Sequence, residues 1–183
     1  METHDPERLK EAIRAMIEQI RQRPGGTEVT FRTSTERDAG FRCSARARGR
    51  HHVIVDESQR MGGTGQGMNP VELLLGAMGT CQEIMYTLYA ALLDIPLDRV
   101  RIECRGRLDL RGLFGMEEGV PAGLVGVEFD TYLESSAERQ RILELVALAE
   151  RHCPVMDTLS RPVPARGNAF LNGDPLDVPR SAG

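Results

Sequence analysis

Hydrophobic residues recur at helical spacing in three stretches of this chain. The first, residues 6–22, follows Asp5, a residue type that caps helix N-termini, and its apolar positions are Leu9, Ile13, Met16, Ile17 and Ile20. The second, residues 71–93, is apolar on nearly all sides, which is typical of a buried helix. The third, residues 136–152, opens with Ser136 as the expected N-cap and repeats apolar residues along one face. This pattern predicts an amphipathic helix at the start and two long helices further along.

The hydrophobic pattern changes to strict alternation between the first two helices. Three runs, TEVTFRTSTE, FRCSARARG and HHVIVDE, each alternate apolar and polar residues and are separated by glycine-bearing breaks. Residues 100–112 and 125–133 read as two further strands, and RPVPARGNAFL could supply a last one. Strands, helix, strands, helix and strand in this order indicate an α+β fold, with the helices packed on one face of an antiparallel sheet.

The length of the chain and the positions of its prolines and glycines indicate one main domain with two appendages. A chain of 183 residues fits a single domain. Pro24, Gly25 and Gly26 end the first helix, so we expect an N-terminal helical extension over residues 1–26 and the main domain over residues 27–172. The composition of the last stretch, DPLDVPRSAG, predicts a flexible tail over residues 173–183.

Composition narrows the possible partners. The formal charge of -4 argues against a nucleic-acid partner, because such proteins usually carry a basic surface. The start of the chain lacks the apolar core of a secretory signal, so a cytoplasmic location is expected. Residues 71–93 are long enough to span a membrane, but Glu72 and Glu83 lie within them, and a carboxylate near the bilayer centre costs roughly 2.5 to 3.5 kcal/mol. We therefore predict a buried helix and no membrane partner.

Four cysteines are the main candidates for chemistry. Cys43, Cys81, Cys104 and Cys153 are widely scattered, without the short paired spacing of a zinc site or the density of a disulfide framework. On pattern alone, most such cysteines are small buried hydrophobes. Cys153 differs because Pro154, a residue type favoured at the first position of a helix, follows it. Cys153 is thus predicted to cap a short helix, where its thiol should ionise more easily.

The segment NPVELLLGAMGTC, followed 72 residues later by HCPVMDTL, resembles the OsmC and organic hydroperoxide resistance family. VDESQRMGG and GRLDLRGLFGM also look like this family, so the resemblance runs from about Phe31 to Leu171. It implies an OsmC-like fold, an intertwined homodimer and a thiol peroxidase without metal or organic cofactor. Cys81 would attack a small organic hydroperoxide, Cys153 would resolve the sulfenic acid to a disulfide, and a dithiol reductant would reset the pair.

The resemblance also implies an arginine that holds the thiolate and a glutamate that orients this arginine. Arg60 precedes the glycine-rich loop as the family arginine does, and Glu72 is the candidate acid. The glutamate is expected directly after Pro70, where this chain has Val71, and one residue along a helix turns a side chain by about 100°.

Residues around Cys81 could shape a pocket. Gly76 and Gly79 lower helix propensity just before Cys81, which predicts close approach of another element or of a substrate. Met78 and Met85 are the candidate substrate-binding residues, within a wider set of Met61, Met68 and Met116 that could form an adaptable apolar pocket, although methionine is more often core filler. Gln82 and Glu83 are expected to be either paired or exposed.

Val71 also supports an alternative hypothesis. In it, the chain keeps the OsmC-like fold but has lost efficient peroxidase chemistry, and acts as a structural module or binds a small apolar ligand. Titration of the thiols separates the two, because a peroxidatic cysteine should ionise well below the ~8.5 of a free thiol.

Overall fold

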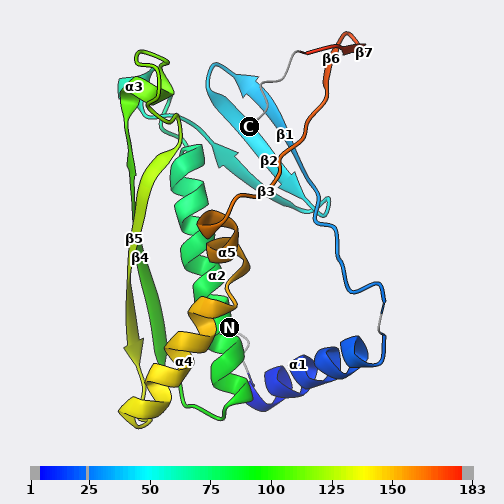
Figure 1. Ribbon diagram of the computed structural model, residues 1–183, viewed down its shortest axis with the longest axis vertical. Helices are drawn as coiled ribbons and strands as arrows, with labels where there is room; N and C mark the ends of the chain where they lie inside the picture. The colour runs from blue at the N-terminus through cyan, green and yellow to red at the C-terminus, as the bar shows by residue number, and fades with distance from the viewer. Residues whose placement is uncertain (1–4, 24, 179–183) are drawn as a thin grey trace.

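The computed structural model describes residues 5–23 and 25–178 and has an α+β architecture (Figure 1). Its helices are α1 (Pro6–Arg21), α2 (Pro70–Leu92), α3 (Leu110–Leu113), α4 (Arg139–Arg151) and α5 (Pro154–Ser160), and η1 (Gln59–Met61) is a 3₁₀ turn. Its strands are β1 (Thr33–Ala39), β2 (Arg42–Ala47), β3 (His51–Val55), β4 (Arg99–Leu108), β5 (Leu124–Glu134), β6 (Ala169–Leu171) and β7 (Asp174–Leu176). The expected order of strands and helices is present.

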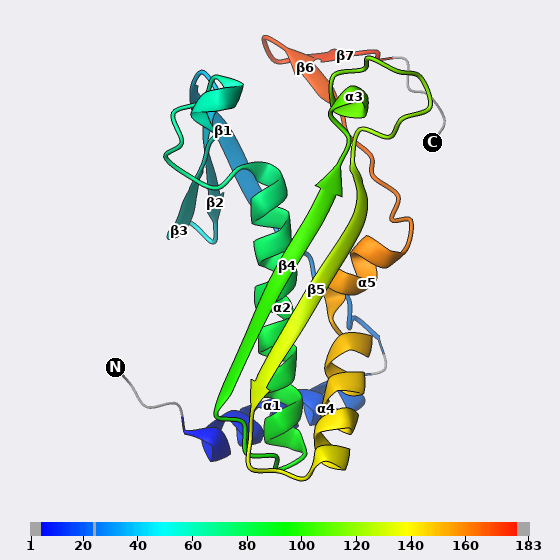
Figure 2. The same cartoon turned by 90° about the vertical axis from the view of Figure 1, so that its left-hand side faces the viewer.

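Helix α2 is the central element, and its two ends are held by specific polar contacts. At its start, Asn69 and Glu72 form a reciprocal capping box, and Pro70 occupies the first turn. At its end, the Arg141 guanidinium from α4 donates hydrogen bonds to the carbonyls of Leu93 and Asp94. Caps at both ends are consistent with a helix of 23 residues that keeps one direction through the molecule (Figure 2).

Strands β4 and β5 form a long antiparallel hairpin that runs along α2 (Figure 2). Their pairing extends from Arg99 opposite Glu134 to Leu108 opposite Leu124. A Cβ atom added at Gly79 of α2 would lie 3.4 Å from the Cys104 sulfur of β4, so this glycine lies where the strand passes close to the helix. The close approach expected near Cys81 is therefore made, in part, by β4.

The expected single sheet is divided into three separate sheets. The first contains β1, β2 and β3, the second β4 and β5, and the third β6 and β7, and all pairs are antiparallel. The three-stranded sheet lies beyond the N-terminal end of α2, away from the β4–β5 hairpin (Figures 1 and 2). Alternation along each strand predicted the strands, but it carries no information on which strands share a sheet.

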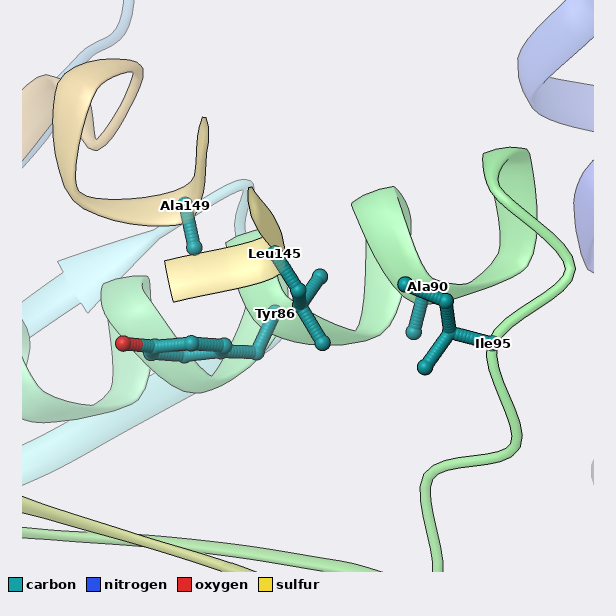
Figure 3. Close-up of a cluster of buried hydrophobic side chains, with 5 residues drawn as sticks. All are labelled: Tyr86, Ala90, Ile95, Leu145 and Ala149. Atoms are coloured by element: carbon teal, nitrogen blue, oxygen red, sulfur yellow. The ribbon is translucent and has the colours of Figure 1, made fainter. Parts of the chain in front are cut away.

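A small core lies between α2, α4 and the β4–β5 hairpin. Tyr86 and Ala90 of α2, Ile95 of the following turn, and Leu145 and Ala149 of α4 form the buried cluster (Figure 3). Half-buried side chains of both hairpin strands pack against it. The helical spacing predicted for the two long helices therefore brings their apolar faces together.

Several predicted ends differ from the structure. The strand expected over residues 100–112 ends at Leu108, because the Asp109 side chain accepts the Arg111 N–H and caps the short helix α3, and the first expected strand begins only at Thr33. Helix α4 begins at Arg139, three residues after the expected cap, because the neighbouring Ser135 hydroxyl accepts the Ala137 N–H and donates to the Pro96 carbonyl in a turn. Strand β7 lies in the stretch expected to be a flexible tail and pairs with β6 through a turn at Asn172 and Gly173, both with positive φ. Residues 179–183 of that predicted tail lie outside the described residues.

Helix α1 packs on α2 rather than standing apart. It begins after Asp5, whose side chain accepts a hydrogen bond from the Glu7 N–H, as the sequence predicted. Lys10 forms an ion pair with Asp94 beyond the end of α2, and Leu9 lines a groove between the two helices. None of the helices in the described part of the chain has the length and apolarity needed to cross a membrane.

Candidate functional site

The structure brings Cys81 and Cys153 together from different helices. Cys81 is half-buried about three turns into α2, and Cys153 is fully buried as the N-cap residue of α5. The Cys81 thiol lies close enough to Cys153 to raise the pKa of Cys153. Because 72 residues separate the two cysteines, the pairing depends on the docking of α5 against α2.

The Cys153 thiol is harder to ionise than an ordinary thiol, which corrects the expectation from its helix-capping position. Burial is the largest effect and raises the pKa of Cys153. The backbone N–H groups of Met156 and Val155 oppose it, as a helix N-terminus should, while the neighbouring Cys81 raises the pKa further. The predicted cap is thus confirmed, but desolvation outweighs the helix terminus.

An apolar groove lies next to α5. It has a volume of about 490 Å³ and is lined by residues of α2, β5 and α5, among them Leu74, Met78, Phe129, Met156 and Leu159. Met78, one of the two candidate substrate-binding residues, borders this groove and is only 2 % exposed. Met85, the other candidate, packs against the buried cluster around Tyr86. The structure therefore places the two methionines in different surroundings.

Neither Arg60 nor Glu72 contacts the cysteine pair through a hydrogen bond in the described part of the chain. Arg60 is exposed on η1, and its side chain forms no hydrogen bond or ion pair with another described residue. Glu72 is held by its own helix terminus, where its carboxylate accepts the Asn69 N–H at 2.9 Å. The glutamate that the family resemblance places directly after Pro70 lies one residue later in this chain, at Glu72, where it caps α2.

A buried aspartate that the sequence analysis did not single out organises the loop that carries Arg60. Asp56 is 2 % exposed and accepts the Thr64 hydroxyl and the N–H groups of Glu57, Thr64 and Gln66. The Thr64 hydroxyl, together with these N–H groups, lowers the pKa of Asp56. Aspartate side chains commonly accept hydrogen bonds from nearby backbone N–H groups in turns. The position of Asp56, directly after a strand and before a glycine-rich stretch, could therefore have indicated this role from the sequence.

Gln82, which was expected to be paired or exposed, is buried and only partly paired. Its side chain is 0 % exposed, and Nε2 donates to the Met156 sulfur at 3.3 Å. Its carbonyl oxygen, Oε1, is buried without a partner among the described residues. Met156 was not among the methionines chosen from the sequence, because only its contact with Gln82 distinguishes it.

The remaining cysteines lie elsewhere. Cys104 of β4 faces α2 near Gly79, and burial raises its pKa, with the Glu83 carboxylate adding to the effect. Cys43 of β2 is half-buried and its thiol donates to the Phe41 carbonyl at 3.6 Å. Neither is near α5 in sequence or topology, and both stay interpreted as structural.

Several solved structures have a similar fold. An OsmC like protein from Mycoplasma pneumoniae matches with a TM-score of 0.64 at 16% identity, covering 73% of this chain and 89% of that chain. An organic hydroperoxide resistance protein OsmC from Legionella pneumophila gives 0.52 at 19% identity, covering 72% and 91%. One from Elizabethkingia anophelis gives 0.56 at 16% identity, covering 73% and 89%. At such identities these matches show the fold alone.

At the level of sequence, the chain matches one family model. No curated protein sequence matches the chain. The family model described as OsmC-like protein matches residues 63–166, which is more than half of the chain and includes both Cys81 and Cys153. The chain therefore belongs to the OsmC-like protein family.

Proposed function

We propose that this protein reduces small organic hydroperoxides with the thiols of Cys81 and Cys153. The observation that supports the proposal is the proximity of these two thiols, which are 72 residues apart in sequence and are brought near each other by the packing of α5 against α2. Structurally similar proteins from Legionella pneumophila and Elizabethkingia anophelis are called organic hydroperoxide resistance proteins, which agrees with this chemistry.

The proposed cycle has three steps. The Cys81 thiolate attacks the terminal peroxide oxygen, the O–O bond breaks, and the alkoxide takes up a proton and leaves as an alcohol, so that Cys81 becomes a sulfenic acid. Cys153 then attacks the Cys81 sulfur, a disulfide forms, and the hydroxyl leaves as water. A dithiol reductant exchanges with this disulfide, restores both thiols and leaves as its own disulfide.

The surroundings of Cys153 suit the resolving role. Burial keeps its pKa raised, so the thiol stays protonated until Cys81 has been oxidised. Its proton can then move to the sulfenic hydroxyl as the S–S bond forms, and water leaves. A protonated thiol is a poor nucleophile, so Cys153 is not expected to attack the hydroperoxide itself. We assign that attack to Cys81.

Arg60 and Glu72 complete the proposed machinery. A thiolate this far inside a helix needs a nearby cation, because the helix-dipole effect falls off within the first turn. We assign this role to Arg60, which is brought to Cys81 by closure of its loop or by assembly of the homodimer, and Glu72 fixes the start of α2 beside that loop. Met78 and Met85 are the proposed contacts for the alkyl part of the substrate.

A homodimer is part of this proposal. The single chain exposes 14729 Å², whereas a compact monomer of 20.3 kDa should expose about 8,800 Å². Large apolar side chains contribute to this surface, including Phe31 at 90 % and Ile84 at 64 % exposure. Burial of such side chains against a second copy would remove apolar area on the scale of an obligate interface. We place the dimer in the reducing cytoplasm.

The test measures consumption of cumene hydroperoxide with dithiothreitol as the dithiol. Cys81→Ser should abolish turnover, and Cys153→Ser should leave a sulfenic acid on Cys81 that dimedone traps. Cys43→Ser is the matched control and should retain turnover, because that thiol lies on the separate three-stranded sheet. Full activity of Cys81→Ser would show that the assignment is wrong.

A second function is favoured by the position of Arg60. Since its guanidinium is exposed and Glu72 is engaged in capping, the chain could instead bind a small apolar molecule in the groove beside α5 without turnover. Titration of thiol alkylation against pH distinguishes the two functions. A Cys81 thiol that reacts only near the pH of a free thiol supports the binding function.

A further inference from the structure

The pairing of Gln82 with Met156 leaves a buried amide poorly satisfied. Gln82 is completely buried, and its N–H donates to the Met156 thioether at 3.3 Å. A thioether sulfur is a weak acceptor. The amide carbonyl has no partner at all among the residues that the structure describes. A buried side-chain amide normally finds partners for both of its polar atoms, so this one is set up for a further polar group.

Met156 lies between the buried amide, the cysteine pair and the apolar groove. It is the third residue after Cys153 on α5, and its backbone N–H points to the Cys153 thiol. It is half-buried and lines the groove of about 490 Å³ together with Met78. An apolar peroxide in this groove would therefore meet a methionine sulfur that already has a hydrogen-bonding amide beside it.

We propose that Met156 is a second oxidation site of the protein, which an organic hydroperoxide converts to methionine sulfoxide. The Met156 sulfur attacks the terminal peroxide oxygen, an S–O bond forms and the O–O bond breaks. The hydroperoxide proton passes to the alkoxide, which leaves as an alcohol. The sulfur loses two electrons and the peroxide gains two, so no further reactant is required. The reaction needs neither cysteine and goes beyond the proposed peroxidase cycle.

Gln82 can assist this reaction through its amide N–H, which already points to the Met156 sulfur. Once the sulfoxide has formed, its oxygen is a strong acceptor for the amide N–H that the thioether satisfies poorly. Gln82 is thus a positioning residue for Met156. Met78 borders the same groove but has no such amide contact in the described chain, so Met78 is the comparison residue for Met156.

The test uses the full chain with Cys81→Ser, so that the proposed cysteine cycle does not consume the reagent. The protein is treated with tert-butyl hydroperoxide, and sulfoxide formation at each methionine is followed by peptide mass spectrometry. If exposure alone controlled oxidation, Met116 at 72 % exposed would react first. We expect Met156 to react ahead of Met116, and Met78 to stay largely unoxidised.

A second variant tests the role of the amide. Gln82→Leu in the same background should slow oxidation of Met156 about fivefold, the factor expected for one hydrogen bond of ordinary net strength, and leave Met116 unchanged. Oxidation in the order of exposure, with Met116 ahead of Met156, overturns the proposal. This ranking does not depend on the folding of Gln82→Leu. It also does not depend on peroxide turnover, which is measured separately in the chain that retains Cys81.

Discussion

Replacement of Tyr86 by Phe should stabilise the protein, although the change removes a buried hydroxyl. Tyr86 is 0 % exposed, and neither its hydroxyl nor that of the neighbouring Thr131 has a hydrogen-bond partner within the described structure. A buried hydroxyl without a partner costs about 1–3 kcal/mol. Phenylalanine removes this cost and retains the ring packed against Leu145 and Ala149 (Figure 3). We expect the free energy of unfolding to rise by about 1 kcal/mol.

The assay is urea denaturation of both proteins at one fixed protomer concentration, because assembly makes stability depend on concentration. Tyr86→Ala is the matched control for the ring. It should lower the free energy of unfolding by about 3–5 kcal/mol, because it leaves a cavity where the ring was. The opposite signs of the two changes separate the hydroxyl from the ring.

Alkaline pH should increase the difference between Tyr86 and Phe. Burial raises the pKa of Tyr86, and the Glu150 carboxylate adds to this effect. The folded state therefore keeps the phenol proton above the ordinary pKa of 10.0, where the unfolded state releases it. Stability from this group is complete below pH 10 and declines as the pH rises further, and Tyr86→Phe lacks this decline.

The reasoning would be refuted by a loss of stability of about 1 kcal/mol or more in Tyr86→Phe. In that case, a double-mutant cycle with Thr131→Val should show coupling between the two hydroxyls, which would identify a hydrogen bond between them. Coupling near zero, with stabilisation by Phe, agrees with two separate unpartnered groups.

Two further predictions concern the loop that carries Arg60. Gly63→Ala should destabilise the loop strongly, because the new Cβ would lie 1.9 Å from the Glu57 carbonyl oxygen, whereas Gly25→Ala meets nothing within 4 Å and should be neutral in the same thermal unfolding assay. Because the pKa of Asp56 is lowered in the folded state, its carboxylate stabilises the protein at pH values above 3.8, the ordinary pKa of an aspartate. This stability is lost as the pH falls through the lower pKa of the folded state. Asp56→Asn should therefore make the free energy of unfolding less dependent on acid pH. Parallel acid unfolding curves for the two proteins would contradict this assignment.

Local pattern was sufficient for most elements of the fold. Period-two runs predicted β1, β2 and β3, and the structure pairs them in sequence order. The apolar stretch over residues 71–93 predicted α2 to within one residue at each end, and the Asn69 cap and Pro70 that fix its start were found only in the structure. A last strand was expected within RPVPARGNAFL, where β6 lies, but its partner β7 was missed, although Asn172-Gly173 is a strong turn signal.

Less of the candidate site could be predicted from the sequence pattern. Resemblance to a family selected Cys81 and Cys153, whereas their spacing alone gave no reason to pair them. The capping position of Cys153 was read correctly, but its pKa was predicted in the wrong direction. Burial of this thiol comes from packing between α5 and α2, and such desolvation cannot be read from neighbouring residues.

The sequence by itself determined the longer helices, most strands and the residues that cap α1 and α5, because these depend on hydrogen bonds and periodicity within a few residues. Only the tertiary structure decided that the strands divide into separate sheets, that Gln82 is buried against Met156, and that Arg60 is exposed. These features depend on which distant segments exclude water from one another, and the free-energy cost of a buried polar group is set by those contacts.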